Sequence, residues 1–479
     1  MALSSFSFIL FLLASVIAVR LCPKRLRRTI LLLAGFGYAL TFGPWALVSA
    51  AGTGLFAWLA GRVTDKREGN ARRNAAFAGV GIIAAWLVAA KTLFRDAALT
   101  GASYYALSSI AYLLDIKRKK IRSEKDPLFV IGYLTSFLTL NQGPFVRRSD
   151  FGAEYLEPRT VGARDLKRGA LRMLWGFLKK IVIADGMSKF VGIAFSGSNV
   201  FAPCVWLGVF LYTIEIYMDF SGYMDIIAGA GCALGVTVPE NFDDPLFSAS
   251  VAEFWRRWHI TLGAWFKDYV FFPISVSKPM TRLARKLREK KHKALAKRLT
   301  AIIPLFFVWV LTGLWHGTGM NYLVWGLLNG LCIALSTCLE GRYAVWKNKL
   351  GIRGGKAWHA FSVIRTFVLL TLIRVFSRAG SVSSALNVFK GMATAGRRIG
   401  GAAALFVGLQ PAETTWLLIA CFLSVIVLLL ERLAGIRKLL DWYCARCRFV
   451  RCLIAVVLFF IVLVCHGDTV TGQFIYAQF

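Results

Sequence analysis

The sequence has little charge for its length and very little acid. Charged residues make up only 17% of its 479 positions, and 25 Asp and Glu stand against 58 Lys and Arg. Hydrophobic residues make up 57% of the chain, which is more than ordinary soluble domains contain. This composition excludes an ordinary soluble protein and indicates a membrane protein.

Apolar runs close to the length of a bilayer crossing recur along the whole sequence. They cover residues 5–19, 29–61, 75–94, 169–198, 201–238, 300–338, 360–378, 415–431 and 452–465. Several of these runs are long enough for two crossings, and no soluble domain, linker or internal repeat separates them. We therefore predict one all-α, polytopic membrane domain over residues 1–479, with about eleven transmembrane helices.

The positions of the basic residues indicate which loops face the cytoplasm. They cluster in the short gaps between apolar runs, as the positive-inside rule predicts for cytoplasmic loops that face anionic lipid. The charge therefore indicates topology, and we expect no nucleic acid partner. Residues 1–19 carry no Lys or Arg before their apolar core, so this helix is expected to be retained with the N-terminus outside. The C-terminal tail, residues 467–479, is expected outside as well.

Cysteine is scattered, and its pattern indicates neither a disulfide framework nor a metal. Most of the ten cysteines lie in apolar runs, where Cys behaves as a small buried hydrophobe. Cys444 and Cys447 form a lone C-x-x-C, whereas a zinc site needs about four ligands. We expect no metal site and no bound cofactor.

Two segments are expected not to cross the membrane as straight helices. Residues 128–146 contain LNQGP, and the Gly-Pro break between two basic loops predicts a re-entrant segment. Such backbone persists at membrane depth only where protein or a wet cavity surrounds it. In YMDFSGYMD, Asp219, Ser221 and Asp225 interrupt an apolar run, and ionisable residues there usually face an interior path.

Residues 239–274 interleave aromatic and charged side chains. A helix is expected to begin near Ser248 or Ser250, with Glu253 completing a capping box, and to lie in the membrane interface. Interfacial anchoring accounts for the tryptophans of this stretch. It does not account for His259.

Five stretches of the sequence, taken together and in their order along the chain, are more informative than any one of them alone. They are GASYYALSSIAYLLDIKRKK, LNQGPFVRRSDF, IYMDFSGYMDIIAGAGCALGVT, PENFDDPLFSASVAEFWRRWHITLGAWFKDYVFFPI and LTGLWHGTGMNYLVWGLLNG. Together they resemble the membrane-bound O-acyltransferase family, in particular its bacterial branch of alginate O-acetyltransferase-like proteins and the teichoic acid D-alanyl transferase, over roughly residues 100–338. The resemblance implies a ring of tilted helices around a central tunnel, in which donor and acceptor meet from opposite faces.

The resemblance also implies positions for the site. The essential histidine of the family, in a W-H-G element, falls on His316, and a second recurrent histidine, in R-W-H, falls on His259. His259 is expected to orient the donor or to stabilise the oxyanion, or else to bond a headgroup or a backbone carbonyl. The chain departs from many relatives at Asn329, where they have histidine, and at Ser275 and Val276, where they have two glycines.

The chemistry of acyl transfer favours His316 independently of the family. Moving an acyl group onto a hydroxyl requires a base, and imidazole titrates near neutrality. Gly313, Gly317 and Gly319 lack side chains, so backbone or substrate can approach and the helix is expected to break there. The alternative role for His316 is polar packing against a neighbouring helix.

Further residues are expected to contact substrate. They are Trp315, Asn329, Asp219, Ser221, Trp258 and Arg257. For Asp219 and Asp225 the alternative is a structural ion pair with Arg256 or Arg257.

The tail FIYAQF supplies a third catalytic candidate, Tyr476. It resembles a C-terminal element of alginate-type relatives, in which the implied role of the tyrosine is to carry the acyl group in transit. A phenol can do so when a base activates it. The alternative is an interfacial aromatic anchor.

Residues 281–298 contain nine Lys or Arg in eighteen positions. We expect a solvated helix or loop that faces lipid headgroups. The same charge is suited to attracting an acidic acyl carrier protein or the phosphate of CoA.

These observations predict an O-acyltransferase of the bacterial cytoplasmic membrane. It is expected to move an acyl group, acetyl first, from a cytoplasmic thioester (acetyl-CoA or an acyl carrier protein) to hydroxyls of an exported envelope polysaccharide. D-alanyl transfer to teichoic acid is the alternative within the family, and a transporter or lipid flippase is the alternative outside it. Membrane lipids and an extracellular SGNH-type or esterase-like protein are the expected partners, the latter because the chain has no G-x-S-x-G elbow.

Overall fold

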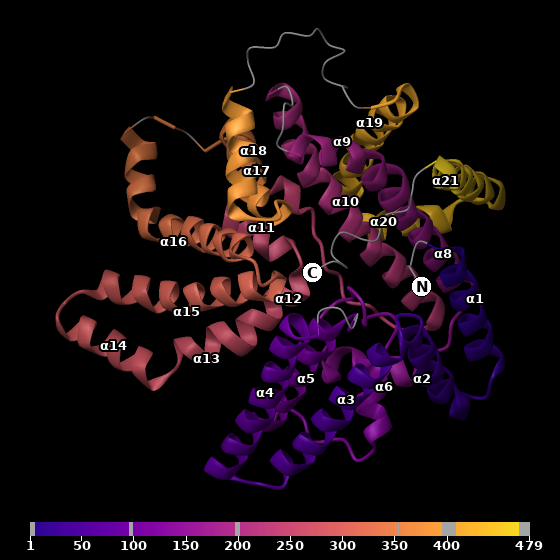
Figure 1. Ribbon diagram of the computed structural model, residues 1–479, viewed down its shortest axis with the longest axis horizontal. Helices are drawn as coiled ribbons and strands as arrows, with labels where there is room; N and C mark the ends of the chain where they lie inside the picture. Colours follow the sequence, from indigo (N-terminus) through magenta and orange to yellow (C-terminus); the bar gives the residue numbers. More distant parts are fainter. Residues whose placement is uncertain are drawn as a thin grey trace. The chain divides into compact units, whose positions relative to one another are not determined.

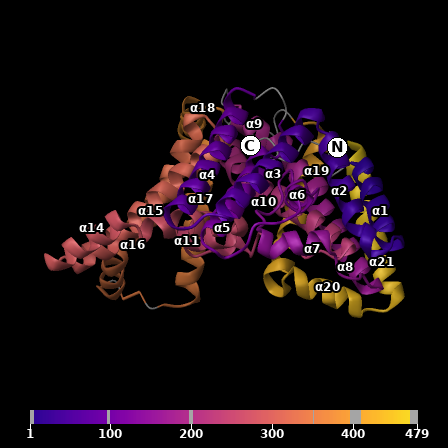
Figure 2. The ribbon, with the colours of Figure 1, turned by 90° about the horizontal axis from the view of Figure 1, so that it is seen from below.

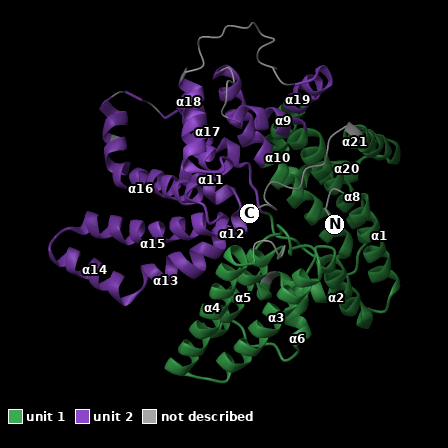
Figure 3. Ribbon diagram, viewed as in Figure 1, with its two compact units in different colours: residues 1–185, 217–240, 423–479 green, residues 186–216, 241–422 purple. Residues whose placement is uncertain are grey.

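The computed structural model describes residues 5–94, 99–196, 202–349, 351–352, 354–394 and 409–468. These residues are mostly helical, and no β-strand occurs among them, which confirms the all-α prediction. Internal contacts divide the chain into two units (Figure 3). Unit 1 comprises residues 1–185, 217–240 and 423–479, and unit 2 comprises residues 186–216 and 241–422.

Unit 1 consists of the N-terminal helices, the second part of one long helix and the C-terminal helices. Its elements are α1 (Phe6–Leu21), α2 (Lys24–Leu40), α3 (Pro44–Asp65), α4 (Gly69–Thr92), α5 (Ala102–Lys117), α6 (Pro127–Leu134), α7 (Ala153–Leu156), α8 (Ala163–Phe177), the π-helical segments η2 (Arg148–Gly152) and η3 (Leu178–Ala184), the end of α10 (Ala202–Leu234), the end of α19 (Pro411–Ala434), α20 (Ile436–Ala445) and α21 (Arg448–Asp468). Helices α3, α4 and α5 pack side by side (Figures 1 and 2). Glycines permit this approach, since a Cβ at Gly61 would lie 2.8 Å from the Tyr112 ring.

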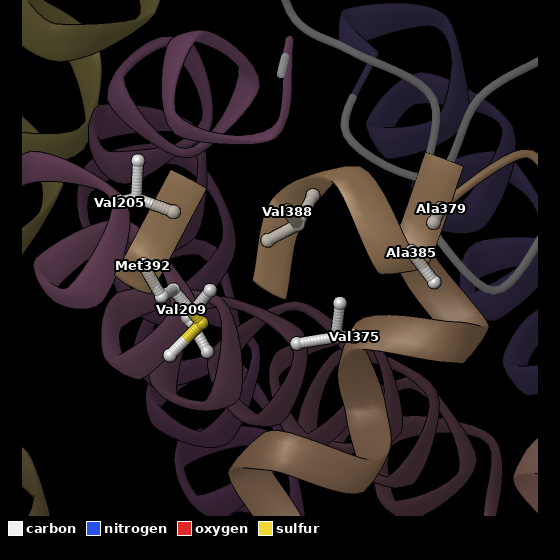
Figure 4. Packing of buried hydrophobic residues seen from close by; sticks show 7 residues of the cluster. All are labelled: Val205, Val209, Val375, Ala379, Ala385, Val388 and Met392. Carbon is white, nitrogen blue, oxygen red and sulfur yellow. The ribbon is translucent and has the colours of Figure 1, made fainter. Parts of the chain in front are cut away.

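Unit 2 contains the remaining helices. They are α9 (Asp185–Phe195), the start of α10, η4 (Pro245–Phe247), α11 (Val251–Arg257), α12 (Ile260–Phe266), the π-helical segment η5 (Lys267–Phe271), α13 (Phe272–Ser275), α14 (Lys278–Glu289), α15 (Lys293–His316), α16 (Met320–Lys349), α17 (Lys356–Arg378), α18 (Val382–Thr394) and the start of α19. Helices α15 and α16 form a hairpin (Figure 1). Valines of α10, α17 and α18, among them Val209, Val375 and Val388, form a buried apolar core (Figure 4).

Among the described residues, eight helices are long and apolar enough to cross a bilayer. They are α3, α4, α10, α15, α16, α17, α19 and α21, and α1 is a shorter apolar helix. The chain is therefore a multi-pass membrane protein. Of the remaining predicted crossings, residues 29–40 lie in the 17-residue α2, and residues 169–198 lie in α8, η3 and α9. The total of about eleven stays a prediction.

The segment expected to be re-entrant does not form a straight spanning helix. Helix α6 has only eight residues, and the backbone of residues 135–147 that follows is not helical. Most of this stretch is buried within unit 1. Gly101 explains part of the packing, because a Cβ there would lie 1.9 Å from the Leu140 carbonyl oxygen. Irregular backbone is thus covered by protein, as it must be at membrane depth.

The predicted interruption at YMDFSGYMD is wrong, because α10 runs through it without a break. Its glycines serve helix packing. A Cβ at Gly222 would lie 2.8 Å from the Gly176 carbonyl oxygen, and a Cβ at Gly229 would lie 2.6 Å from that of Gly169. The glycines let α10 approach α8 closely, and the helix continues through them.

The helix was expected to break at Gly313, Gly317 and Gly319. The break is confirmed at Gly317, which caps α15 after His316, and it is wrong at Gly313, which lies within the helix. A Cβ at Gly313 would lie 2.8 Å from the Tyr322 carbonyl oxygen, and one at Gly326 would lie 2.6 Å from that of Trp309. The expected close approach of backbone at Gly313 is therefore confirmed, and it occurs between α15 and α16.

The basic segment 281–298 was expected to be a helix or a loop, and most of it is helical. It occupies α14 and the first turn of α15, and most of its side chains are exposed.

Candidate functional site

His316 is the last residue of α15, at the point where the chain turns into α16. Its side chain is 6% exposed. The imidazole lies between two indoles, with ring centroids 4.6 Å from Trp315 and 4.8 Å from Trp325. The turn must be tight because a Cβ at Gly317 would lie 2.4 Å from the Tyr322 ring. The glycines after His316 thus hold α16 close enough for Trp325 to contact the imidazole.

Trp325, which contacts His316, forms a buried cluster with Trp309 and Ile373, and the partly buried Trp255 packs against this cluster. The ring centroid of Trp255 lies 4.9 Å from that of Trp309 and 5.6 Å from that of Trp325. Asn329 orients this cluster, because it accepts a hydrogen bond from Trp255 Nε1 (3.0 Å) and donates one to the Trp325 carbonyl oxygen (2.9 Å). Its side chain is fully buried. The substrate-binding role expected for Asn329 stays a prediction.

His259 lies between two short helices, in a backbone conformation that few residues adopt. Helix α11 begins as predicted, because the Ser250 side chain accepts from the Glu253 backbone N–H (3.1 Å). It ends at Arg257, and α12 begins only at Ile260. His259 has φ 48° and ψ 52°, in the left-handed region.

Backbone pairing with an earlier segment explains this break. The Asp243 N–H donates to the Arg257 carbonyl (3.0 Å), and the Ile260 N–H donates to the Asn241 carbonyl (3.0 Å). Phe242 and Trp258 form an isolated antiparallel bridge between these bonds. Hydrogen bonds to residues 241–243 thus replace helical ones at this turn.

Asn241 determines which imidazole nitrogen of His259 carries the proton. The Asn241 side-chain oxygen accepts from the Thr261 N–H (3.0 Å), a group that can only donate. The atom that faces His259 Nδ1, at 3.3 Å, is therefore an oxygen. This contact requires the proton on Nδ1 and leaves the lone pair on Nε2.

Burial keeps this imidazole neutral. His259 is 2% exposed, and burial lowers its pKa to about 3. Its ring centroid lies 6.1 Å from that of Trp315, the residue that also contacts His316. The structure therefore brings His259, Trp315 and His316 together, and we call these three residues with Trp325 the histidine–tryptophan site.

Arg257 and Trp258 have different surroundings. Arg257 forms an ion pair with Glu253 (2.8 Å) on the same short helix, and its side chain is 28% exposed. Trp258 is buried and stacks on Phe254 with ring centroids 5.4 Å apart. Trp258 is thus part of the packing that supports the turn at His259.

The three polar residues expected in α10 belong to a buried ion cluster in unit 1. Asp219 accepts from Lys180 (2.8 Å), and Asp225 accepts from Lys179 (2.7 Å). The Ser221 hydroxyl lies 3.3 Å from Lys179 Nζ. Structural ion pairing was expected, but these lysines were not the expected partners.

Further charged residues complete this ion cluster. Lys179 also contacts Glu431 (2.5 Å), Lys180 also contacts Asp185 (2.8 Å), and Arg172 bridges Asp225 (3.0 Å) and Glu240 (2.6 Å). Burying charge is costly unless opposite charges compensate it. A sequence signal was present in the lysine pair of LKKIVIA, which stands in the middle of an apolar run.

Tyr476 lies outside the described residues, as does most of the tail expected over residues 467–479. The sequence analysis missed two residues at the site, Asn241 and Thr261, which lie twenty positions apart in sequence and meet only through the fold. Both histidines lie in the part of the chain that resembles known proteins.

The model of the membrane-bound O-acyltransferase family matches residues 91–373. A probable alginate O-acetylase of Pseudomonas fluorescens is 33% identical over 239 residues, which are 50% of this chain and 45% of that protein. The peptidoglycan O-acetyltransferase of Helicobacter pylori is 30% identical over 318 residues, covering 60% of this chain and 56% of its own. The teichoic acid D-alanyltransferase of Bacillus subtilis is 26% identical over 274 residues, which are 56% of this chain and 65% of that protein. The chain thus spans about half the length of the first two relatives.

Proposed function

Because the chain belongs to the membrane-bound O-acyltransferase family, we propose that it transfers an acyl group from a thioester donor to a hydroxyl of a cell-envelope polymer. The observation that carries the proposal is the pair of buried imidazoles, His316 and His259, on either side of Trp315. The unprotonated nitrogen of a neutral imidazole can accept the proton of a hydroxyl, which acyl transfer to an alcohol requires. The same two positions carry the histidine elements on which the family resemblance rests.

His316 is the proposed general base. It takes the proton of the acceptor hydroxyl while the hydroxyl oxygen attacks the thioester carbonyl carbon. The carbon–sulfur bond then breaks, and the departing thiolate takes the proton from the imidazolium, so that an ester and a free thiol are formed. The position of His316 at the C-terminal end of α15 supports this role, because that end of a helix carries partial negative charge that stabilises a developing imidazolium.

His259 is proposed to orient the donor. A neutral imidazole with its proton on Nδ1 can accept a hydrogen bond at Nε2, but it cannot donate one there. It is therefore better suited to holding a donor N–H or O–H group than to stabilising an oxyanion, which needs a hydrogen-bond donor. Of the two roles expected for His259, the contact with Asn241 favours the first.

The finer assignments rest on similarity. Acetyl transfer to an exported polysaccharide is the first choice, since two of the similar proteins are named as O-acetylating alginate or peptidoglycan. D-alanyl transfer to teichoic acid is the second, because a similar protein carries that name. A cytoplasmic thioester as donor, location in the bacterial cytoplasmic membrane and an extracellular esterase-like partner belong to the same proposal.

Tyr476 is proposed to carry the acyl group between donor and polymer. In that step His316 removes the phenol proton, and the phenolate oxygen forms an ester with loss of the thiol. Peptide mass spectrometry of the protein incubated with acetyl-CoA is expected to find an acetyl group on Tyr476 and none in the Tyr476→Phe variant. An unmodified tail together with a fully active Tyr476→Phe variant would contradict the relay.

The proposed function is tested by following label from donor to polymer. Membranes that contain the chain and are given radiolabelled acetyl-CoA are expected to form base-labile ester on exported polysaccharide, about tenfold or more above membranes without it. A D-alanyl-loaded carrier protein as donor tests the second choice. Labelled compound that crosses the membrane without any ester being formed would instead identify a transporter.

A further inference from the structure

Arg374 of α17 is a buried cation next to the turn that carries His259. It is 4% exposed, although α17 is long and apolar enough to cross a bilayer. The central guanidinium carbon lies 4.5 Å from the centroid of the Trp258 ring and 4.9 Å from that of Phe254. Arg374 also lies one position beyond the residues that match the family. The resemblance therefore assigns it no role.

A crevice beside Arg374 could suggest a site for a small anion. Ser248, Thr366 and Phe254 are among the residues that line it, and it has no room for a water molecule. The guanidinium is therefore packed against protein, and a packing role fits better than ligand binding.

The rings that Arg374 contacts determine the position of His259. Trp258 precedes His259 in the chain and stacks on Phe254 with an interplanar angle of 22°. The Phe242 ring meets Trp258 edge-on at 5.0 Å. A planar guanidinium stacks on aromatic faces and is more weakly hydrated than an ammonium, so Arg suits such a buried position.

Arg365, nine positions earlier on α17, contacts the other end of α11. Its side chain donates a hydrogen bond to the Ala249 carbonyl oxygen (2.9 Å). One helix thus contacts α11 through two arginines, of which only Arg374 contacts the end next to His259. The pair offers a matched comparison within a single helix.

We propose that Arg374 is a positioning residue that holds the Trp258–His259 turn closed through its contacts with the Trp258 and Phe254 rings. Its contribution to catalysis rests on the proposed function, whereas its effect on His259 does not. Without the guanidinium, Trp258 loses one of its packing partners, and the left-handed turn at His259 opens more often.

The opening of the turn can be measured without any assay of activity. Diethyl pyrocarbonate acylates accessible neutral imidazoles, and peptide mass spectrometry gives the rate at each histidine of the full chain. His292 is exposed and serves as the internal reference. Relative to His292, His259 is expected to react slowly in the wild type and about tenfold faster in Arg374→Met. In Arg374→Lys the rate at His259 should lie between those of the wild type and Arg374→Met, because lysine keeps the charge but cannot stack as a plane on the rings.

Three results would overturn the proposal. They are an unchanged His259 rate in Arg374→Met and Arg374→Lys, an equal increase in Arg365→Met, and an increase at His316 as large as that at His259, which would indicate general loosening. If Arg374→Met does not purify as a folded protein, Arg374→Lys carries the test. A wild type without acyl-transfer activity would contradict the proposed function and leave this measurement valid.

Discussion

The two buried polar regions of this protein differ in how they are neutralised. In the ion cluster of unit 1, Lys179 and Lys180 each contact two carboxylates, and Arg172 contacts Asp225, which it shares with Lys179, and Glu240. In the histidine–tryptophan site of unit 2, the two imidazoles contact indole rings and an amide. In the ion cluster, buried charges of opposite sign compensate each other. In the histidine–tryptophan site, the side chains carry no net charge.

This difference suits the ion cluster to a structural role and the histidine–tryptophan site to a chemical one. A lysine between two buried carboxylates can give up its proton only by leaving uncompensated negative charge in a region of low dielectric. A neutral imidazole can accept a proton from a hydroxyl and pass it to a leaving group without breaking an existing ion pair. We therefore expect substitutions in the ion cluster to affect stability first and those in the histidine–tryptophan site to affect activity first.

The largest loss of stability is expected from Lys180→Met. The substitution leaves Asp185 and Asp219 buried without the ammonium that lies 2.8 Å from each. The free energy of unfolding should fall by about 3 to 5 kcal/mol. Thermal unfolding of the detergent-solubilised protein measures it.

The control for this prediction is Lys189→Met, which removes a lysine from an exposed ion pair with Glu413. Exposed pairs contribute little, so the melting temperature should barely change. Equal melting temperatures for both variants would show that the ion cluster does not stabilise the fold.

The next effect is expected from glycines at the two helix crossings. In Gly222→Ala the new methyl would lie 2.8 Å from the Gly176 carbonyl oxygen, and in Gly313→Ala it would lie 2.8 Å from that of Tyr322. Each should destabilise the protein by about 1 to 3 kcal/mol. Only Gly313→Ala should also slow acyl transfer per folded molecule, because it displaces the turn after His316.

Gly37→Ala is the matched control, since nothing lies within 4 Å of a Cβ at that position. It should leave stability unchanged or slightly raised, because Ala favours helix. If Gly222→Ala slowed transfer per folded molecule as much as Gly313→Ala, the separation of the two regions would be contradicted.

The next effect is a dependence of the stability on pH, which arises from His259. Its pKa is lowered to about 3 in the folded protein, against about 6.5 in an unfolded chain. Between these values the unfolded chain binds a proton that the folded protein does not, so stability is complete above about pH 6.5 and falls as the pH is lowered. The contribution is about 1.4 kcal/mol for each pH unit.

His259→Asn should remove this contribution, because Asn does not titrate and tolerates the left-handed backbone. Melting temperatures of wild type and variant between pH 7.5 and pH 5 should therefore converge as the pH is lowered. Parallel curves would mean that His259 is not held neutral.

Local features of this fold could be predicted from sequence. The cap formed by Ser250 and Glu253 depends on residues three positions apart, and helix segments follow from the apolar runs. The break predicted at Gly313 was wrong because a glycine that interrupts a helix and one that lets another helix approach look identical in sequence. Only the neighbouring helix, a tertiary feature, distinguishes them.

The candidate site was predicted in part. His259 and His316 could be identified from their motifs, whereas the residues that orient them could not. The Nδ1 proton of His259 depends on Asn241, eighteen positions away, and Lys180 meets Asp219 across thirty-nine positions. Pairings at such separations are determined by which helices pack together.

The central claim is that His316 takes up the proton of the attacking hydroxyl. It is tested most directly by comparing His316→Ala with His292→Ala in the radiolabelled acetyl-transfer assay, because both residues stand at the two ends of the same helix, one buried and one exposed. His316→Ala should lower the rate of ester formation by about 10² to 10⁴ while the protein stays folded, and His292→Ala should leave it unchanged. A His316→Ala protein that transfers acetyl groups at the wild-type rate would contradict the account.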